Sequence, residues 1–167
     1  YYYSCTRDWE RSYSPQWKDM GAAGWATRNA KTENNLMVKQ LAGKRSGRTN
    51  IKATEKDLEI AMRTLRERFI VGRMDQMEES IHRFNIVLGI DETTDLNRGC
   101  MDEFFGHGSK KSNSHSHPEV PEDSEAYQVL AEKNVWDLKL HEFILEQFDI
   151  QRDLLSSCRT ERGRGVD

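Results

Sequence analysis

The chain has few cysteines and no long apolar run. Cys5, Cys100 and Cys158 are widely spaced and form neither a Cys-x-x-Cys pair nor a zinc-binding spacing. One disulfide with one free thiol and no disulfide at all are both compatible with this count, so the cysteines do not identify the redox compartment. No segment approaches the roughly 18 consecutive apolar residues that a membrane-spanning helix needs.

Further absences concern the start of the chain and its charge. There is no secretory signal peptide, and the first residue is Tyr1 rather than Met. Because residues 1–4 (Tyr-Tyr-Tyr-Ser) look like the interior of a helix, we expect the chain to be a fragment without its N-terminal part. The formal net charge of -3 gives no general attraction toward nucleic acid or an anionic membrane.

The length and composition predict one domain with a modest core, since the chain has 167 residues, of which 36% are hydrophobic and 32% are charged. The clearest pattern begins at Thr54, which has Asp57 three residues later in the spacing of a capping box. The helix predicted there carries an apolar face formed by Leu58, Ala61, Met62, Leu65 and Phe69. Residues 69–71 then form an apolar run before Gly72 that is too short for a helix, and they predict a buried strand.

A second amphipathic helix follows this apolar run. Asp75 and Glu78 predict its start, and Gly89 predicts its end. Its apolar face is expected to consist of Met77, Ile81, Phe84 and Leu88. Residues 54–90 therefore predict a unit of helix, buried strand and helix.

Weaker patterns predict the end of a helix at 1–12, a loop at 14–31, a short helix or turn at 34–43 and a last helical element at 124–156. Gly43 is expected to close the short helix. The last element is expected to break near Asn134, which would cap the second part with Asp137 behind it. Residues 159–167 have the composition of a frayed tail, so the folded part is expected to span 1–158.

Two polar loops are candidates for contact with an anion. Residues 44–52 form a basic loop that is either solvated surface or a phosphate contact through Lys44, Arg45 or Arg48. Residues 106–121 form a long polar loop without periodicity, and such loops in compact domains are usually functional or disordered.

Other chemistry has little support in the sequence. His115 and His117 lie two residues apart, with Cys100 and His107 upstream, but no further ligand spacing accompanies them, so we expect no metal site. The helical positions of His82 and His141 predict structural or solvated side chains. The chain has no Gly-x-x-x-x-Gly-Lys-[Ser/Thr] phosphate loop and no recognisable catalytic triad.

Several segments resemble the C-terminal half of the Golgi carbohydrate sulfotransferases, the family that includes heparan sulfate 2-O-sulfotransferase and uronyl 2-O-sulfotransferase. The most specific likeness is that of residues 58–89 to the family's helix, F-x-V-G segment and E-x-x-E-S helix. Residues 35–43 (NLMVKQLAG) resemble its N-x-x-V-R-x-L-A-G segment, with Lys39 where Arg is usual. An ammonium is a point charge, so this exchange weakens any bidentate grip on an anion there.

Three further segments resemble the family, and all five occur in the family's order along the chain. Residues 1–4 resemble the aromatic run that comes after its 3′-phosphate-binding Arg and Ser. Residues 111–118 resemble its polar loop before the last helix, and residues 135–148 resemble its closing D-x-x-x-x-E-F helix. The resemblance thus covers residues 1 to about 155.

The resemblance implies sulfuryl transfer from 3′-phosphoadenosine 5′-phosphosulfate to a carbohydrate hydroxyl, on a glycosaminoglycan-type acceptor in the Golgi lumen. It implies an α/β fold class, with this chain as the mostly helical C-terminal part of a P-loop-like sulfotransferase domain. A membrane anchor would belong to a missing N-terminal part. We expect no metal and no nucleic-acid partner, and the acceptor position and the oligomeric state stay open.

The resemblance also limits which residues of this chain touch the donor. The family places its 5′-phosphosulfate loop and its catalytic base upstream of the aromatic run. We therefore assign no catalytic residue here and expect the isolated chain to be inactive. The residues expected to contact the nucleotide are Lys111, Asn113, Ser114 and His115. The competing hypothesis is a non-catalytic helical protein-interaction module.

Overall fold

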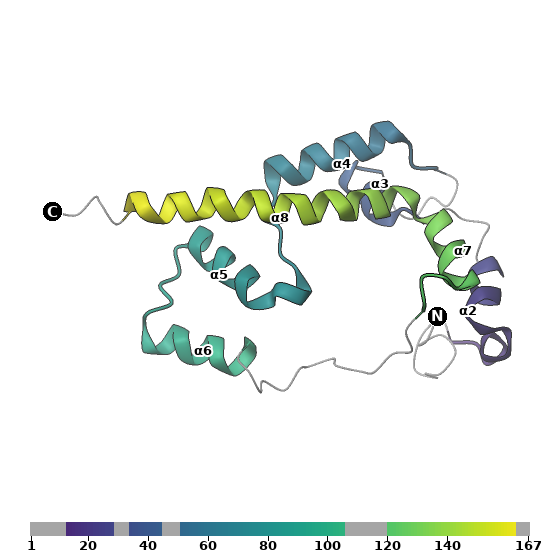
Figure 1. The fold of residues 1–167 in the computed structure, drawn as a ribbon, viewed down its shortest axis with the longest axis horizontal. Coiled ribbons are helices and arrows are strands. Elements are labelled where there is room, and N and C mark those ends of the chain that lie inside the picture. Colours follow the sequence, from purple (N-terminus) through teal and green to yellow (C-terminus); the bar gives the residue numbers. More distant parts are fainter. Residues whose placement is uncertain (1–12, 29–33, 45–50, 106–119, 163–167) are drawn as a thin grey trace. The chain divides into compact units, whose positions relative to one another are not determined.

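A computed structural model describes residues 13–28, 34–44, 51–105 and 120–162 of the chain. Within these ranges the chain is mostly helical and contains no β-strand (Figure 1). The elements are α2 (Gln16–Arg28), α3 (Leu36–Leu41), α4 (Glu55–Arg68), the 3₁₀ turn η2 (Met74–Gln76), α5 (Met77–Leu88), α6 (Asp95–Phe105), α7 (Glu125–Lys133) and α8 (Val135–Arg162).

The chain divides into two compact units. The first comprises Tyr1–Ala61 and His115–Leu140, and the second comprises Met62–Ser114 and His141–Asp167. The boundary falls within α4 and within α8, so each of these helices contributes residues to both units.

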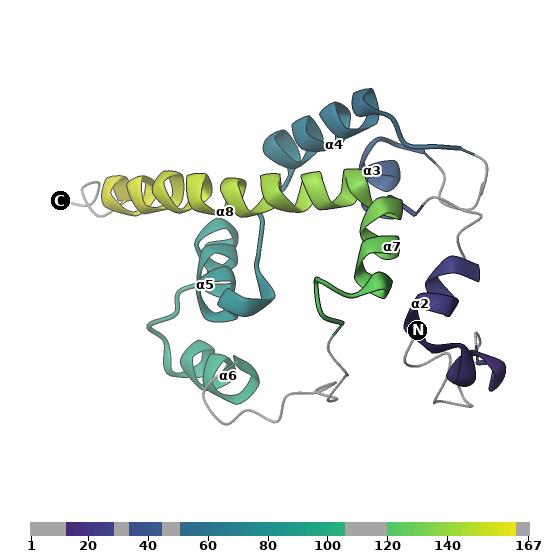
Figure 2. The same cartoon turned by 45° about the vertical axis from the view of Figure 1, so that its right-hand side comes forward.

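In the first unit, α3 and the start of α8 cap each other. The side-chain oxygen of Asn35 accepts hydrogen bonds from the backbone N–H groups of Trp136 and Asp137, at 2.8 and 3.1 Å. The carboxylate of Asp137 in turn accepts from the N–H groups of Val38 and Met37, at 2.9 and 3.2 Å. The donors at both helix starts, which have no partner inside their own helix, are therefore satisfied across about one hundred residues of sequence. Figures 1 and 2 both show α3 beside the beginning of α8.

The position of Asn35 explains how it serves both helices. Its backbone has a φ of 38°, in the left-handed region that Asn tolerates better than most residues. Its amide nitrogen donates to the carbonyl of Lys133 at 3.1 Å, and its side chain is almost fully buried. The predicted break near Asn134 is confirmed, but the predicted cap is wrong. The side chain of Asn134 donates back to the Leu130 carbonyl at 2.7 Å.

The predicted loop at 14–31 is also wrong where the structure describes it, because residues 16–28 form α2 and pack against α7. Ala26 is fully buried, and the ammonium of Lys133 donates to its carbonyl. The helix is kinked at Gly21, whose φ of 68° interrupts the helical backbone. This kink breaks the apolar period, so the sequence shows no single apolar face.

The predicted helix at the centre of the chain is confirmed as α4. Its start is a capping box in which the Thr54 N–H donates to the Asp57 carboxylate at 2.7 Å and the Asp57 N–H donates to the Thr54 hydroxyl at 3.4 Å. The predicted face is buried at Leu58, Ala61 and Leu65.

In the second unit, the predicted buried strand at 69–71 is absent. Val71 is buried, but Phe69 and Ile70 are substantially exposed, and the segment pairs with no strand among the described residues. The side-chain amide of Gln151 replaces a neighbouring strand. Its oxygen accepts from the Val71 N–H at 2.8 Å, and its nitrogen donates to the Phe69 carbonyl at 2.9 Å. Two of the backbone groups that a sheet would pair are thus satisfied by α8.

The next residues pack closely onto α5. A Cβ atom at Gly72 would lie 2.7 Å from the ring of Phe84, so glycine allows this approach. The hydroxyl of Ser80 accepts a hydrogen bond from the Arg73 N–H at 2.8 Å. It lies within donating distance of the carbonyls of Gln76 and Arg73, at 2.8 and 3.1 Å. Asp75 does not cap the helix as predicted, because its carboxylate pairs with the Arg73 guanidinium at 2.5 Å.

The buried face of α5 is more polar than its sequence predicts. Its buried residues are Ser80, Arg83 and Asn85, whereas Leu88 of the predicted apolar face is 71% exposed. The guanidinium of Arg83 lies 3.6 Å from the ring centre of Phe148, donates to the Phe148 carbonyl, and contacts the Glu79 carboxylate at 2.7 Å. The predicted end of the helix is confirmed, since Gly89 has a left-handed φ of 70°.

Candidate functional site

The residues predicted to contact the nucleotide lie outside the described part of the chain. Lys111, Asn113, Ser114 and His115 all belong to residues 106–119. Arg45 and Arg48 of the basic loop fall in residues 45–50, which are likewise not described. Their assignment therefore stays a prediction.

Lys44 is the one member of the basic loop's three candidate cations whose contacts the structure gives. Its ammonium lies 2.5 Å from the Asp57 carboxylate and 3.1 Å from the Lys52 carbonyl. The side chains of Lys44 and Asp57 are only 27% and 8% exposed. Lys44 therefore fastens the loop to the capping box of α4, and this role competes with contact to a phosphate.

The charge of Asp57 is stabilised by these contacts. Burial alone raises the pKa of Asp57, but the hydrogen bonds from Lys44 and Thr54 outweigh this effect and hold its pKa below the ordinary value. Lys39, at the position where the resembled family usually has Arg, is also buried, with 9% of its surface exposed. Neither lysine of this region is presented as an open surface cation.

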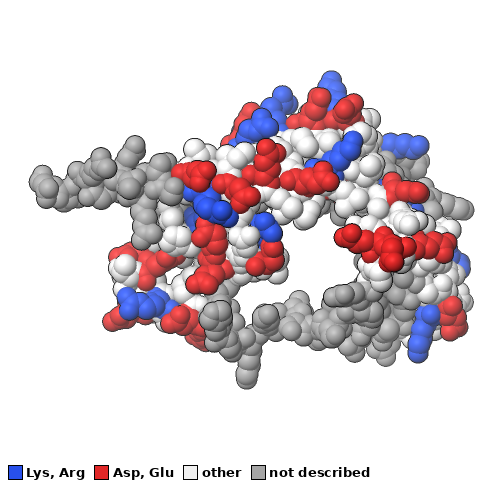
Figure 3. Space-filling model, viewed as in Figure 1, with Lys and Arg blue, Asp and Glu red and all other residues white. Residues whose placement is uncertain are grey.

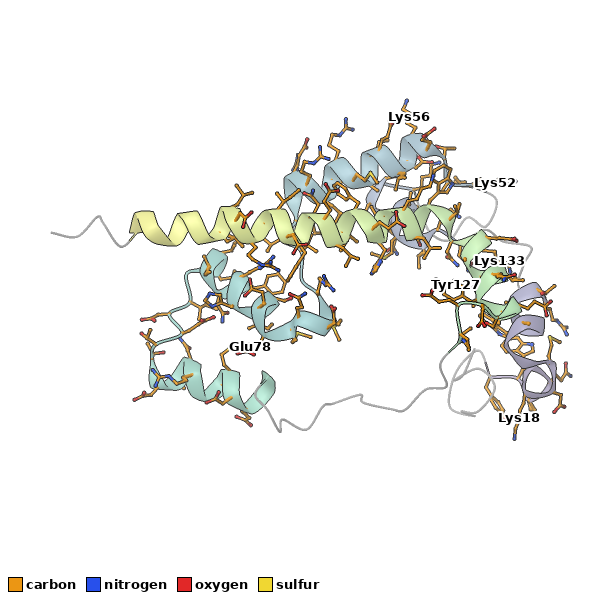
Figure 4. All side chains as sticks on the ribbon, in the orientation of Figure 1. Lys18, Lys52, Lys56, Glu78, Tyr127 and Lys133 are labelled. Carbon is orange, nitrogen blue, oxygen red and sulfur yellow. The ribbon has the colours of Figure 1, made fainter. Side chains whose placement is uncertain are left out.

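The second unit contains a cleft that the sequence did not predict. It has a volume of about 650 Å³ and lies between α5 and α6. Figure 2 labels both helices, which are joined by a short turn. It is lined by Asp75, Gln76, Met77, Glu78, Glu79, His82, Glu92, Arg98 and Met101. Figure 4 shows Glu78 extending from α5 toward α6. A volume of this size falls in the range of ligand pockets.

A hydrogen-bonded network holds one wall of this cleft. The imidazole Nδ1 of His82 lies 2.7 Å from one oxygen of Glu92, and the amide of Asn85 donates to the other oxygen at 2.9 Å. The same amide lies 3.6 Å from the sulfur of Met101 on α6. His82 and Glu92 are each about one-third exposed. A carboxylate that fixes one nitrogen of a histidine in this way orients the ring and selects its tautomer.

Most other charges of the cleft are also paired within the protein. The Arg73 hydrogen bond lowers the pKa of Asp75, and Glu79 is engaged by Arg83. The Arg98 guanidinium donates to the Thr93 carbonyl at 2.6 Å. His82 thus joins α5 to the turn that precedes α6 and remains about one-third exposed. The His82–Asn85 spacing places both side chains on one helical face, but only the turn geometry brings Glu92 to them.

The described ranges contain no group of three or more His, Cys, Asp or Glu side chains arranged to hold a metal ion. In the same ranges, every helix is too short or too polar to cross a membrane.

In comparisons with known proteins, the chain matches no family model, no curated protein and no solved structure.

The Lys44–Asp57 contact predicts a specific acid sensitivity. A carboxylate whose pKa is lower in the folded than in the unfolded state stabilises the fold above the unfolded pKa of about 3.9. That stabilisation is lost as the pH falls through the lower, folded pKa. Asp57→Asn should reduce the free energy of unfolding near neutral pH by about 1–3 kcal/mol. It should also flatten the loss of stability below about pH 4.

Urea unfolding followed by circular dichroism at a series of pH values checks this prediction. Asp123→Asn, a change of the same chemistry at an exposed position, serves as the control and should leave the profile of the wild type unchanged. An acid dependence that is identical in wild type and Asp57→Asn would show that the ion pair does not contribute.

Proposed function

We propose that this chain is the C-terminal part of a carbohydrate sulfotransferase, which moves a sulfuryl group from 3′-phosphoadenosine 5′-phosphosulfate to a sugar hydroxyl. In this proposal the chain provides helices of a P-loop-like α/β domain on the lumenal side of the Golgi membrane. The sheet, the phosphate loop and the membrane anchor would come from a segment that precedes Tyr1.

The observation that carries the proposal is the reciprocal cap between α3 and α8. Asn35 is the first residue of the segment that resembles N-x-x-V-R-x-L-A-G, and Asp137 is the first residue of the segment that resembles D-x-x-x-x-E-F. Asn35, which directly precedes α3, accepts from the first turn of α8, and Asp137, in that first turn, accepts from the first turn of α3. Two likenesses found separately in the sequence therefore meet in one set of four hydrogen bonds, which an accidental resemblance gives no reason to expect.

The remaining likeness in the described part of the chain supports the same reading. Gly72, at the end of the segment that resembles F-x-V-G, packs against Phe84 and Ser80 of the E-x-x-E-S-like helix. Within that helix, Glu79 pairs with Arg83, which lies on Phe148 of the closing helix. Residues of the two resembled segments therefore also contact one another within the second unit.

The proposed reaction assigns this chain a supporting role in the chemistry. The acceptor oxygen attacks sulfur, the bond from sulfur to the bridging phosphate oxygen breaks, and a base takes the hydroxyl proton while the bisphosphorylated nucleotide leaves. We place the base and the 5′-phosphosulfate contacts in the preceding segment. The polar loop with Lys111, Asn113, Ser114 and His115 would contact the 3′-phosphoadenosine of the donor.

Activity tests the proposal directly. The product of the complete reading frame should transfer radiolabelled sulfate from the donor to desulfated heparan or chondroitin chains, and the 167-residue chain alone should not. If the longer protein binds the donor but transfers no sulfate to any glycan, that result would contradict the proposed reaction. Transfer by the 167-residue chain alone would contradict our placement of the base and donor loop.

The contribution of the polar loop is tested with Lys111→Ala in the same complete protein. A charge-assisted hydrogen bond to phosphate is worth about 1.5–3 kcal/mol, so affinity for the desulfated nucleotide should fall by roughly one to two powers of ten. Acceptor affinity should change much less. Calorimetric titration measures both, with Lys56→Ala on the exposed face of α4 as the control. Equal nucleotide affinity in wild type and Lys111→Ala would leave the loop as a linker.

A further inference from the structure

The segment from Met74 to Phe105, which comprises η2, α5, the following turn and α6, is strongly acidic. We call it the acidic hairpin. Its cations are Arg83 and Arg98, and its carboxylates are Asp75, Glu78, Glu79, Asp91, Glu92, Asp95, Asp102 and Glu103. Eight carboxylates and two cations give it a formal net charge of -6, whereas the whole chain has -3, so all other residues together carry +3. On the face shown in Figure 3, red carboxylates predominate over this hairpin.

The acidic hairpin also exposes large apolar side chains, which an acidic solvated surface does not need. They lie at its start, at the end of α5 and at the beginning of α6, and they are Met74, Val87, Leu88, Ile90 and Leu96. Met74 is 84% exposed and Leu96 83%. A large exposed apolar patch rimmed by polar residues is typical of surfaces that bind another protein.

The cleft combines both properties within the same element. Met77 and Met101 supply apolar lining, and thioether side chains adapt to irregular partners. The exposed carboxylates of Glu78 in the cleft and of Asp102 and Glu103 on α6 are not among the ion pairs described above. They are the groups that an incoming cation would meet first.

We propose that the acidic hairpin is a docking surface for a cationic amphipathic segment of a partner protein. Lysine or arginine side chains of the partner would meet the carboxylates, and aliphatic side chains would cover the exposed apolar groups. The charge disfavours nucleic acid, an anionic membrane and a glycosaminoglycan, all of which are polyanions. This surface therefore differs in partner chemistry from the sulfotransferase site proposed above and does not depend on it.

The test measures binding of defined peptides to the 167-residue chain by fluorescence anisotropy. The probe is a fluorescein-labelled helical peptide built from leucine and lysine, and a second peptide replaces every lysine by glutamine. The lysine peptide should bind more tightly by about tenfold or more at low salt, and added salt should reduce this preference. Equal affinity for both peptides would overturn the proposed charge recognition.

Two sets of variants locate the surface. The combined variant Glu78→Gln, Asp102→Asn and Glu103→Gln should weaken binding of the lysine peptide by about tenfold. Its matched control is Glu122→Gln, Asp123→Asn and Glu132→Gln, with the same charge change at exposed positions of the first unit. An equal loss in both variants would reduce the effect to net charge and overturn the proposal.

The apolar contribution is tested in the same assay. Leu88→Gln with Leu96→Gln should weaken binding by tenfold or more, because both side chains are exposed in the free protein and covered in the complex. The control pair is Leu36→Gln with Leu138→Gln, two exposed leucines of the first unit. Circular dichroism should show the same helicity in each variant. Self-association of the wild type through Leu88 and Leu96, measured by light scattering, would overturn the choice of occupant in favour of a second copy.

Discussion

A helix cannot satisfy the backbone N–H groups of its own first turn, and this constraint shapes the first unit. Here α3 is only six residues long, too short to be stable by its own hydrogen bonds. Asn35 and Asp137 satisfy these N–H groups in both helices at once. Each side chain accepts hydrogen bonds from two backbone N–H groups of the other helix. The start of the long helix α8 and the short helix α3 are therefore parts of one hydrogen-bonded unit.

Polar side chains perform comparable tasks in the second unit. The side chain of Gln151 accepts a hydrogen bond from the Val71 N–H and donates one to the Phe69 carbonyl, as a neighbouring strand would. The Ser80 hydroxyl accepts a hydrogen bond from the Arg73 N–H. Arg83 is 1% exposed and is held by a carboxylate, a carbonyl and an aromatic ring. Such networks impose geometry more strictly than apolar contacts do, because a misplaced partner leaves a buried polar group unsatisfied.

Local signals in the sequence predicted local structure well. The capping box at Thr54, the face of α4, the glycine that ends α5 and the break before α8 are all visible within one or two helical turns. The sequence does not predict the kinked helix α2, because Gly21 removes its apolar period. The strand at 69–71 was predicted wrongly, because an apolar run does not reveal whether its backbone partner is a strand or a glutamine side chain.

Features that join distant residues could not be read from periodicity. The reciprocal hydrogen bonds of Asn35 and Asp137 join residues about one hundred positions apart. In the sequence, each of these two residues could equally well cap only its own helix. The α5–α6 cleft depends on a turn that brings Glu92 to His82. The polar loop with Lys111 remains a prediction based on resemblance, since it lies outside the described residues.

The central claim is that Asn35 and Asp137 act as one structural unit, and a double-mutant cycle on unfolding free energy tests it most directly. Asn35→Gly removes the amide without penalising the positive φ, and Asp137→Ala removes the carboxylate. Each change should cost about 1–3 kcal/mol, and the double variant should cost less than the sum by about 1 kcal/mol or more. Pairing Asn35→Gly with Glu59→Ala, at an exposed position of α4, should instead give additive effects. Additivity for Asn35 and Asp137 as well would contradict the claim.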